Sequence, residues 1–241
     1  MAKKELKTKY LGSVLGIWWA VITPLLMMGA ITFIFTKVLN IGIERFPLFS
    51  LAGIIPWFFL SVSLSEVTPS LISKSQLLKQ FSFPIEFIPI SSVLSNFINF
   101  LIGLCFIIPV FIVFQTKVIS VLAFLPLILF LHLLFTIGLG LALSCLNIFF
   151  RDISHLLGVI LIFWFWMTPI FYSLDMVPEQ YRWICNLNPM TTYIELYRDV
   201  LFKARMPSLD ALLVASAIGL GVFCAGYIIF TKKETCFIKR V

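Results

Sequence analysis

Six long apolar runs, separated by short polar breaks, constrain this chain more than any other feature of its sequence. They lie at about 18–37, 48–67, 87–114, 118–146, 155–172 and 209–230. A helix needs about 20 mostly apolar residues to cross a membrane, because the hydrocarbon layer is about 30 Å thick and a helix rises about 1.5 Å per residue. The sequence therefore predicts one all-α membrane domain, residues 1–241, with six transmembrane helices.

The charged residues are few and lie beside the apolar runs. Only 12% of the residues are charged, about half the share in a soluble domain, and the mean hydropathy is +1.06. The net charge of +7 does not indicate nucleic-acid binding, because no basic face interleaved with aromatic residues lies outside the apolar runs. The five cysteines form no CxxC pair or Cys/His cluster, so we interpret them as small apolar fillers.

Both ends of the chain are rich in lysine, and this predicts their side of the membrane. Cytoplasmic loops carry an excess of Lys and Arg, and two basic ends on one side require an even number of spans. With both termini inside, the inner side holds eleven Lys and Arg and the outer side seven, four of which lie in residues 173–208. The sequence predicts that both termini are cytoplasmic.

Two segments that contain polar residues are predicted to lie at the inner face. Residues 1–17 carry an apolar stripe at helical spacing, with lysines at other positions, and are predicted to form an amphipathic helix in the membrane interface. That stripe consists of Leu6, Tyr10, Val14 and Trp18. Residues 69–86 are bracketed by Pro69 and Pro84 and have mixed polar and apolar character. They are predicted to form a short cytoplasmic helix of about three turns.

Residues 173–208 are too apolar for a plain outer loop. Asn188 and Pro189 predict a helix start, with Asn as the cap and Pro at the first helical position. The helix that follows has an apolar stripe of Tyr193, Tyr197, Val200 and Leu201 opposite Glu195 and Asp199. Re-entrant backbone is allowed only where protein or a wet cavity covers it. The segment is predicted to form an amphipathic or re-entrant helix pair on the outer side.

The sequence contains no motif for nucleotide binding or catalysis. The patterns GxxxxGK[ST], GxGxxG, HExxH and GxSxG are all absent. Ionisable residues inside spans are functional candidates by default, and here the candidates are Glu66 and His132. An ion-coupled carrier typically keeps several such groups as relays. We therefore expect a chain that is not an enzyme, is not ion-coupled and takes its energy from a partner.

The 26 Phe, 6 Trp and 6 Tyr predict mainly packing and anchoring at the membrane surface. Rings that line a conduit would also contact the apolar faces of sugars, because aromatic side chains offer amphipathic surfaces. The candidates for this role are Trp18, Trp19, Trp57, Trp164 and Trp166.

Short motifs occur in a fixed order from about residue 9 to 233. They are Tyr10-x-x-Ser13-x-Leu15-Gly16-x-x-Trp19 with Pro24-Leu25, Gly53-x-x-x-Trp57, Leu77-Leu78-Lys79 with Phe83-Pro84 and Pro89, Asn147-x-x-x-Arg151-Asp152, Thr168-Pro169-Ile170-x-Tyr172, Asn188-Pro189 with Arg198, and Gly226-x-x-x-Phe230. In content and order these motifs resemble the transmembrane subunits of type-2 ABC exporters, in the group that exports polysaccharides and polyol phosphates such as O-antigen, capsule or teichoic acid.

This resemblance implies a permease subunit of the bacterial inner membrane that works as a homodimer with two separate ABC ATPase subunits. It implies export of a long glycan, often lipid-linked, through a channel between the two copies. ATP and Mg would bind the ATPase partner, and no cofactor is expected on this chain.

The resemblance also implies roles for named residues. The helix after the second span, here about 70–83, docks on the ATPase in that family, so the expected coupling residues are Leu71, Lys74, Leu77, Leu78, Lys79, Phe83 and Pro84. We further hypothesise that ATP-driven closure of the partner pushes this helix, and that the push opens a cytoplasmic gate of Lys9, Tyr10, Ser13, Gly16, Trp19, Asn147, Arg151 and Asp152. The segment 173–202 corresponds to the outer gate, with Pro169, Tyr172, Asn188, Pro189 and Arg198.

Several alternatives stay open at this point. Arg151 and Asp152 equally suit a role in capping and anchoring the helices on either side of them, with Arg snorkelling to the interface. The same fold also suits an exporter of a small drug or lipid. An ion channel or carrier is disfavoured by the scarcity of intramembrane charge. A membrane-embedded enzyme is disfavoured because the only acidic cluster suits an amphipathic helix surface; it consists of Asp175, Glu179, Glu195 and Asp199.

Overall fold

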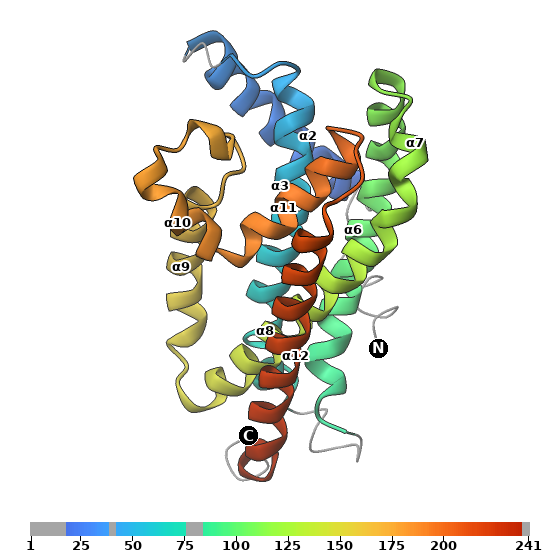
Figure 1. Cartoon of the computed structure of the whole chain (residues 1–241). Helices are drawn as coiled ribbons and strands as arrows, with labels where there is room; N and C mark the ends of the chain where they lie inside the picture. Colours follow the sequence, from blue (N-terminus) through green and yellow to red (C-terminus); the bar gives the residue numbers. More distant parts are fainter. Residues whose placement is uncertain (1–17, 39–41, 76–83, 238–241) are drawn as a thin grey trace.

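The computed structural model describes residues 18–38, 42–75 and 84–237, and every regular element in these ranges is helical (Figure 1). The elements are α2 (Trp19–Thr32), η2 (Phe33–Val38), α3 (Phe46–Val67), α4 (Ser70–Ser73), α6 (Phe87–Phe114), α7 (Val118–Val121), η3 (Leu122–Phe124), α8 (Leu125–Phe149), α9 (Ile153–Met167), η4 (Leu174–Met176), α10 (Glu179–Leu187), α11 (Pro189–Leu201) and α12 (Leu209–Phe237). The all-helical prediction is confirmed for these ranges.

Four of the described helical stretches are long and apolar enough to cross a membrane: Phe46–Val67, Phe87–Phe114, Val118–Phe149 and Leu209–Lys233. They run side by side along the long axis of the molecule (Figure 1). We call the end at which α8 and α12 finish the lower end, and the opposite end, which carries α10 and α11, the upper end. The four stretches follow four of the six predicted apolar runs within a few residues.

The other two predicted runs form shorter apolar helices, Leu25–Val38 and Ile153–Met167. α2 and η2 cross obliquely behind α3 toward the upper end, whereas α9 rises from the lower end at some distance from the other long helices (Figure 1). The 15 residues of α9 extend about 22 Å, which is short of a full crossing. Thr168-Pro169 ends this helix, because a residue before proline avoids the helical conformation and Thr168 is extended.

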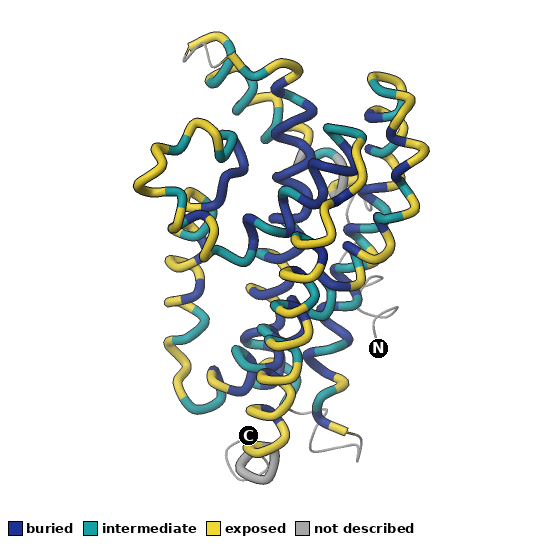
Figure 2. The backbone as a smooth tube through the Cα atoms, viewed as in Figure 1, coloured by how far each residue is buried: buried dark blue, intermediate teal, exposed yellow. Residues whose placement is uncertain are grey.

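α3 is the central helix of the bundle. Its apolar side chains face all directions, a pattern typical of a helix enclosed by others, and most of its residues are buried (Figure 2). α6, α8 and α11 pack around it. The core is therefore built around the second apolar run, and the surfaces of α9 and α12 are largely exposed.

α8 and α12 pack closely against each other because glycines lie at their contact. A Cβ on Gly138 would lie 2.6 Å from the Cα of Phe223, and a Cβ on Gly226 would overlap the carbonyl of Gly138. Small residues let helix backbones come this close in a membrane, where packing replaces the hydrophobic effect as the force between helices. The Gly226-x-x-x-Phe230 motif is thus a packing motif, and its Phe230 is fully buried.

Two predicted segments fall largely outside the described residues. The predicted interface helix 1–17, with Lys9, Tyr10, Ser13 and Gly16, lies outside them entirely. Of the predicted cytoplasmic helix 69–86, the structure describes one short helix, α4 (Ser70–Ser73). Leu77, Leu78, Lys79 and Phe83 also lie outside the described residues.

Candidate functional site

The residues predicted for the outer gate lie at the upper end, and Asn188 makes the first of two junctions there. Its Oδ1 accepts a hydrogen bond from the backbone N–H of Met190 at 3.0 Å, and this caps α11 as predicted. The same oxygen accepts a hydrogen bond from the indole of Trp164 at 2.7 Å. The amide nitrogen donates to the hydroxyl of Thr168 at 2.9 Å. One side chain therefore joins the end of α9 to the start of α11.

Trp164 connects Asn188 to the buried helix α3. Its ring packs edge-on against the ring of Trp57 on α3, with centroids 5.7 Å apart. Trp57 also contacts Phe165 and is only 4% exposed. The ring of Trp57 is therefore enclosed within one chain, which argues against its predicted role in lining a conduit between two copies.

Arg198 makes a second junction between α11 and α3. Its guanidinium donates one hydrogen bond to the carbonyl of Ile170 at 2.7 Å and one to Glu195 at 2.9 Å, and lies 3.7 Å from the ring centre of Phe49. The side chain is 0% exposed. A Cβ on Gly53 would lie 3.3 Å from the guanidinium, so the glycine of the Gly53-x-x-x-Trp57 motif leaves room for this arginine.

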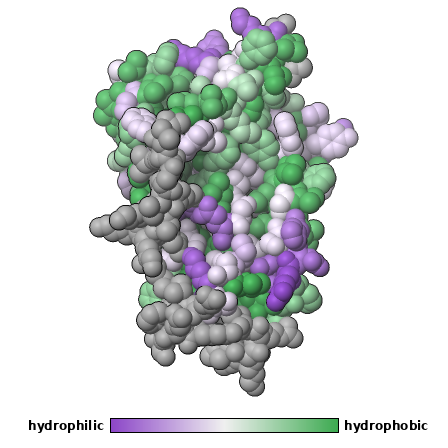
Figure 3. Space-filling view, turned by 180° about the vertical axis from the view of Figure 1, so that it is seen from behind, coloured by the Kyte–Doolittle hydropathy of each residue, from purple (hydrophilic) through white to green (hydrophobic). Residues whose placement is uncertain are grey.

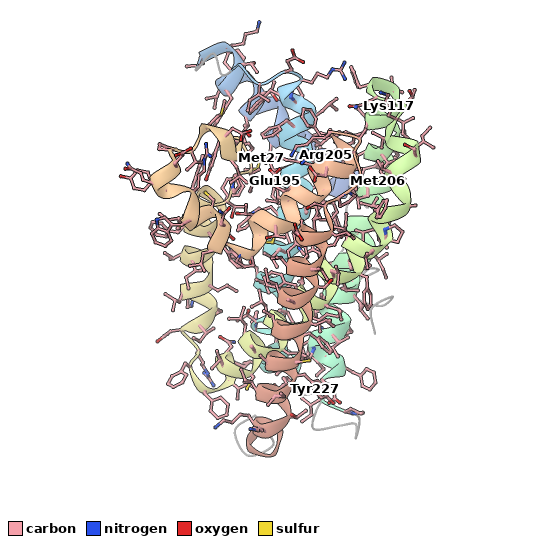
Figure 4. The ribbon with its side chains drawn as sticks, viewed as in Figure 1. Met27, Lys117, Glu195, Arg205, Met206 and Tyr227 are labelled. Atoms are coloured by element: carbon pink, nitrogen blue, oxygen red, sulfur yellow. The ribbon has the colours of Figure 1, made fainter. Side chains whose placement is uncertain are left out.

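The acidic residues of α11 are paired, in contrast to the prediction of a polar helix surface. Lys203 binds Glu195 at 2.7 Å and Asp199 at 3.1 Å, and Arg205 binds Asp199 at 2.9 Å. Figure 4 shows Glu195 and Arg205 at the upper end, where the chain turns from α11 toward α12. Buried charges are retained where partners compensate them. The acidic residues of α11 are therefore explained by their ion pairs and not by contact with solvent.

Burial and ion pairing act in opposite directions on the carboxyl of Glu195. Burial raises its pKa, whereas the neighbouring Arg198 and Lys203 lower it, and the net pKa lies below the ordinary value. The carboxylate therefore stays ionised and keeps both cations in place. We call the set Asn188, Trp164, Arg198, Glu195 and Lys203 the outer cluster.

Pro169 and Tyr172 lie in the connection between α9 and α10 that the outer cluster holds. Pro169 is buried, and the hydroxyl of Tyr172 donates to the carbonyl of Met167 at 3.3 Å. The carbonyl of Ile170, between them, accepts the bond from Arg198. The predicted outer-gate residues are thus neighbours in space, and they fix α9, its upper connection, α11 and α3 relative to one another.

Sequence reasoning missed several residues of this cluster. Phe49 and Glu195 were not assigned to it, although Glu195 precedes Arg198 by the i, i+3 spacing of a helical ion pair. Lys203 and Arg205 lie beyond the end of α11; Lys203 follows Asp199 by the i, i+4 spacing of a helical pair, whereas no helical spacing links Arg205 to Asp199. Ile170 contributes through its backbone carbonyl, for which the sequence carries no signal.

At the lower end, Asn147 performs the capping role that the sequence suggested for its neighbours. Its side-chain oxygen accepts a hydrogen bond from the backbone N–H of Ser154 at 3.2 Å, so α8 holds the start of α9. Asp152 precedes α9, but its side chain makes no capping bond. Arg151 and Asp152 are both exposed.

The described coupling residues divide between buried and exposed positions. Leu71 is fully buried, and α4 packs on α6 and α8, so Leu71 anchors the segment to its own bundle and is not a surface for a partner. Lys74 donates to the hydroxyl of Ser92 on α6 at 3.2 Å. Pro84 is exposed just before α6.

The remaining candidate aromatic residues lie on open surfaces. The side chains of Trp18 and Trp166 are more than half exposed, and that of Trp19 is nearly so. Trp18 also touches Phe106 on α6. These three rings, unlike that of Trp57, are available to lipid, to a second protein or to a passing ligand.

We expect Asn188→Ala to destabilise the chain by about 2–3 kcal/mol, because it removes a helix cap and leaves the polar groups of Trp164 and Thr168 without their partner. Thermal unfolding of the purified chain in detergent measures this loss. Asn186→Ala is the matched control, since Asn186 is exposed on α10 and its loss should cost less than about 0.5 kcal/mol. Equal melting temperatures for the two variants would contradict the role of Asn188.

Comparison with known proteins identifies the family. The family profile described as "ABC-2 type transporter" matches residues 1–202. An O-antigen export system permease protein from Klebsiella pneumoniae is 32% identical over 98% of this chain and 92% of its own length. A second such protein, from Myxococcus xanthus, is 27% identical over 100% of this chain and 94% of its own. A polysialic acid transport protein from Escherichia coli is 27% identical over 98% and 92%. The chain belongs to the ABC-2 type transporter family.

Proposed function

We propose that this chain is the membrane-spanning permease subunit of an ATP-driven ABC transporter that exports a polysaccharide or lipid-linked glycan across the bacterial inner membrane. The observation that carries the proposal is its similarity, over almost its whole length, to permeases named for export of O-antigen and polysialic acid. Separate ATPase subunits bind ATP and Mg. The chain itself carries out no chemistry and bears no cofactor.

The proposed topology has six spans with the lower end in the cytoplasm. The four long apolar helices supply four spans. α9, extended by the connection held at the outer cluster, and the continuous helix of α2 and η2 supply the other two in the assembled transporter. Arg151, Lys232 and Lys233 at the lower end are exposed, as the excess of basic residues on the cytoplasmic side requires.

We propose that a second copy of the chain packs near α9 and that the glycan passes between the copies. Only Leu157 and Leu161 of α9 are buried, and beyond Ser154 and His155 the rest of its surface, including Trp166, is apolar and largely exposed (Figure 2). A helix with so few contacts inside its own chain needs another partner to fix its position. Exposed rings such as those of Trp18 and Trp166 would contact the apolar faces of sugars.

The ATPase subunits are proposed to act on the lower end through residues 70–83. Leu71 and Lys74 attach the start of this segment to α6 and α8, so a force on the segment reaches both helices directly. Asn147 then links α8 to α9. At the upper end, the outer cluster passes a shift of α9 to α10 and α11, which form the proposed outer gate.

Deletion of the chain from its native bacterium should leave the glycan inside the cell, and the wild-type chain should restore it to the surface. We expect Lys79→Glu to restore little of it, because a reversed charge in the proposed docking segment weakens the ATPase contact. Surface glycan and co-purification of the ATPase are the measurements. Lys79 is the cleaner choice over Lys74, whose hydrogen bond to Ser92 supports the fold.

The matched control is Lys232→Glu, which reverses an exposed charge at the same end of the molecule outside the proposed contact. It should export as well as the wild type. Normal surface glycan in the deletion strain contradicts the proposed function. Normal export by Lys79→Glu, with normal expression, contradicts the docking role of 70–83. It does not contradict the proposal that the chain exports a glycan.

A further inference from the structure

Residues 173–187, between α9 and α11, form a compact unit that is bonded mainly to itself. The guanidinium of Arg182 on α10 donates to the carbonyl of Val177 at 3.0 Å and to that of Asp175 at 3.4 Å. The hydroxyl of Ser173 donates to a carboxylate oxygen of Asp175 at 3.2 Å. These bonds hold η4 and α10 together, so a movement of one carries the other.

The two ends of this unit lie close together. The unit begins after Tyr172 and ends at Asn188, whose amide donates to the hydroxyl of Thr168 at 2.9 Å. Compact surface segments of about 6–16 residues whose ends are close and which pack on their own side chains are Ω-loops, and these are frequently functional. Residues 173–187 fit this description, and we call them the outer lobe.

The outer lobe has little contact with the helix bundle. Cys185 is the only buried residue of α10, it lies beside Tyr172, and α10 packs mainly on α11. Three apolar side chains of the lobe are more than half exposed, those of Tyr181, Trp183 and Leu187. Seen from behind, the lobe stands out at the right-hand margin of the upper half (Figure 3). A segment with so few buried contacts opens at low cost.

α11, which follows the outer lobe, is bonded to two long helices. The hydroxyl of Tyr193 donates to the carbonyl of Ala215 on α12 at 3.0 Å and lies 3.3 Å from that of Leu131 on α8. The ring of Tyr193 also stacks on that of His132 on α8, with centroids 5.0 Å apart. Nδ1 of His132 lies 3.3 Å from the hydroxyl of Tyr197. Two tyrosines therefore join α11 to both α8 and α12.

These contacts leave α11 little room to move. Tyr193, Tyr197 and His132 are all 0% exposed, so a displacement of α11 would separate buried polar groups from their partners, which is costly. A Cβ on Gly219 of α12 would lie 2.9 Å from the hydroxyl of Tyr193, so the backbone of α12 already touches this side chain. We therefore expect α11 to keep its position on α8 and α12.

The contrast between the two sides of Asn188 points to a hinge. Asn188 is extended, and the proline that follows it has no backbone N–H with which to continue α10. We propose that the outer lobe is the moving part of the outer gate and turns as one body about Tyr172 and Asn188, while α11 stays fixed. The inference rests on the proposed function, and it narrows the proposed outer gate from α10 and α11 to the lobe alone. A change in the tilt of α9, which carries one end of the lobe, turns it.

The first test locks the lobe to its own attachment. With every native cysteine except Cys185 replaced, Tyr172→Cys places a second thiol beside Cys185 and removes the ring that lies next to it. A short thiol cross-linker that reductant cleaves then joins the lobe to the end of the α9 connection. We expect this cross-link to lower ATP-driven export of a lipid-linked oligosaccharide by the reconstituted complex at least about fivefold, and reductant to restore it.

The matched control is a cross-link inside the lobe. In a chain without native cysteines, Asp175→Cys with Arg182→Cys replaces a contact within the lobe by a covalent link. Export should change by less than about twofold, because a lobe that moves as one body does not flex there. Export that the Tyr172→Cys cross-link leaves unchanged, or that both cross-links block equally, overturns the inference. Absence of export by the wild-type complex contradicts the proposed function instead.

Distance measurements test the fixed half and need no cross-link. Spin labels at Asn186→Cys on α10 and at Thr192→Cys on α11 are each paired with a label at Gly221→Cys on the open side of α12, in complexes diluted with unlabelled chains. During export, the distance from α10 should change by more than about 5 Å and that from α11 by less than about 2 Å, the scales of large element shifts and of packed helices. Equal changes in the two distances, or an unchanged α10 distance in a complex that exports, overturn the inference.

Discussion

Replacement of Arg198 by alanine should destabilise the chain by about 3–5 kcal/mol, the range for breaking a buried ion pair by removing one partner. The loss has three parts. The carbonyl of Ile170 loses its donor, Glu195 keeps only Lys203, and the ring of Phe49 loses the guanidinium packed on it. Thermal unfolding in detergent, together with the yield of folded chain, measures the effect.

Two further variants test the reason for this loss. Arg198→Lys should recover only part of the stability, because an ammonium cannot replace the planar fork that reaches Ile170 and Glu195 together. Arg182→Ala removes an arginine from the same outer segment, where its partner Glu179 is almost fully exposed, and should cost less than about 1 kcal/mol. A melting temperature for Arg198→Ala equal to that of Arg182→Ala would rule out the outer cluster as a stabilising junction.

A single methyl group on Gly226 is expected to have the second large effect. Gly226→Ala places a Cβ against the carbonyl of Gly138, and because both partners are helix backbone, neither rotates away. Overpacking of this kind costs about 1–3 kcal/mol and occasionally more, and we expect the upper part of that range. The apparent melting temperature should fall by roughly 6–10 °C for a chain of this size.

The same helix provides the control. Gly221 also lies on α12, but a Cβ there has nothing within 4 Å. Gly221→Ala should be neutral or slightly stabilising, since alanine favours a helix over glycine. If Gly226→Ala and Gly221→Ala have the same apparent melting temperature, then α8 and α12 do not meet as closely as the structure shows.

The sequence predicts the helices of this chain well because each apolar run has one physical interpretation. Runs such as 87–114 contain no charged residue, so their length and high content of apolar residues define a membrane helix. The cap at Asn188 is equally local, since an asparagine before a proline is a favoured helix start. Local rules of this kind need no knowledge of neighbours.

The candidate site is less predictable because it depends on pairs far apart in the sequence. Arg198 was assigned from the family resemblance, but its burial against Phe49 and Gly53 follows from how α11 packs on α3. Leu71 was expected to face a partner, yet it is buried by α6 and α8. Apolar surface on a short segment looks the same in sequence whether it meets the chain's own bundle or another protein.

The glycine contact between α8 and α12 limits how the chain changes shape. Because the two helix backbones are in contact, sliding or tilting of one against the other is hindered. We therefore expect α8 and α12 to move as one rigid body. α9 has few contacts within the chain. Asn147 links its lower end to α8, and Asn188 links its upper end to α11. In the proposed transporter, α9 is therefore the helix expected to move outward for a bulky glycan, while α8 and α12 keep their positions relative to each other.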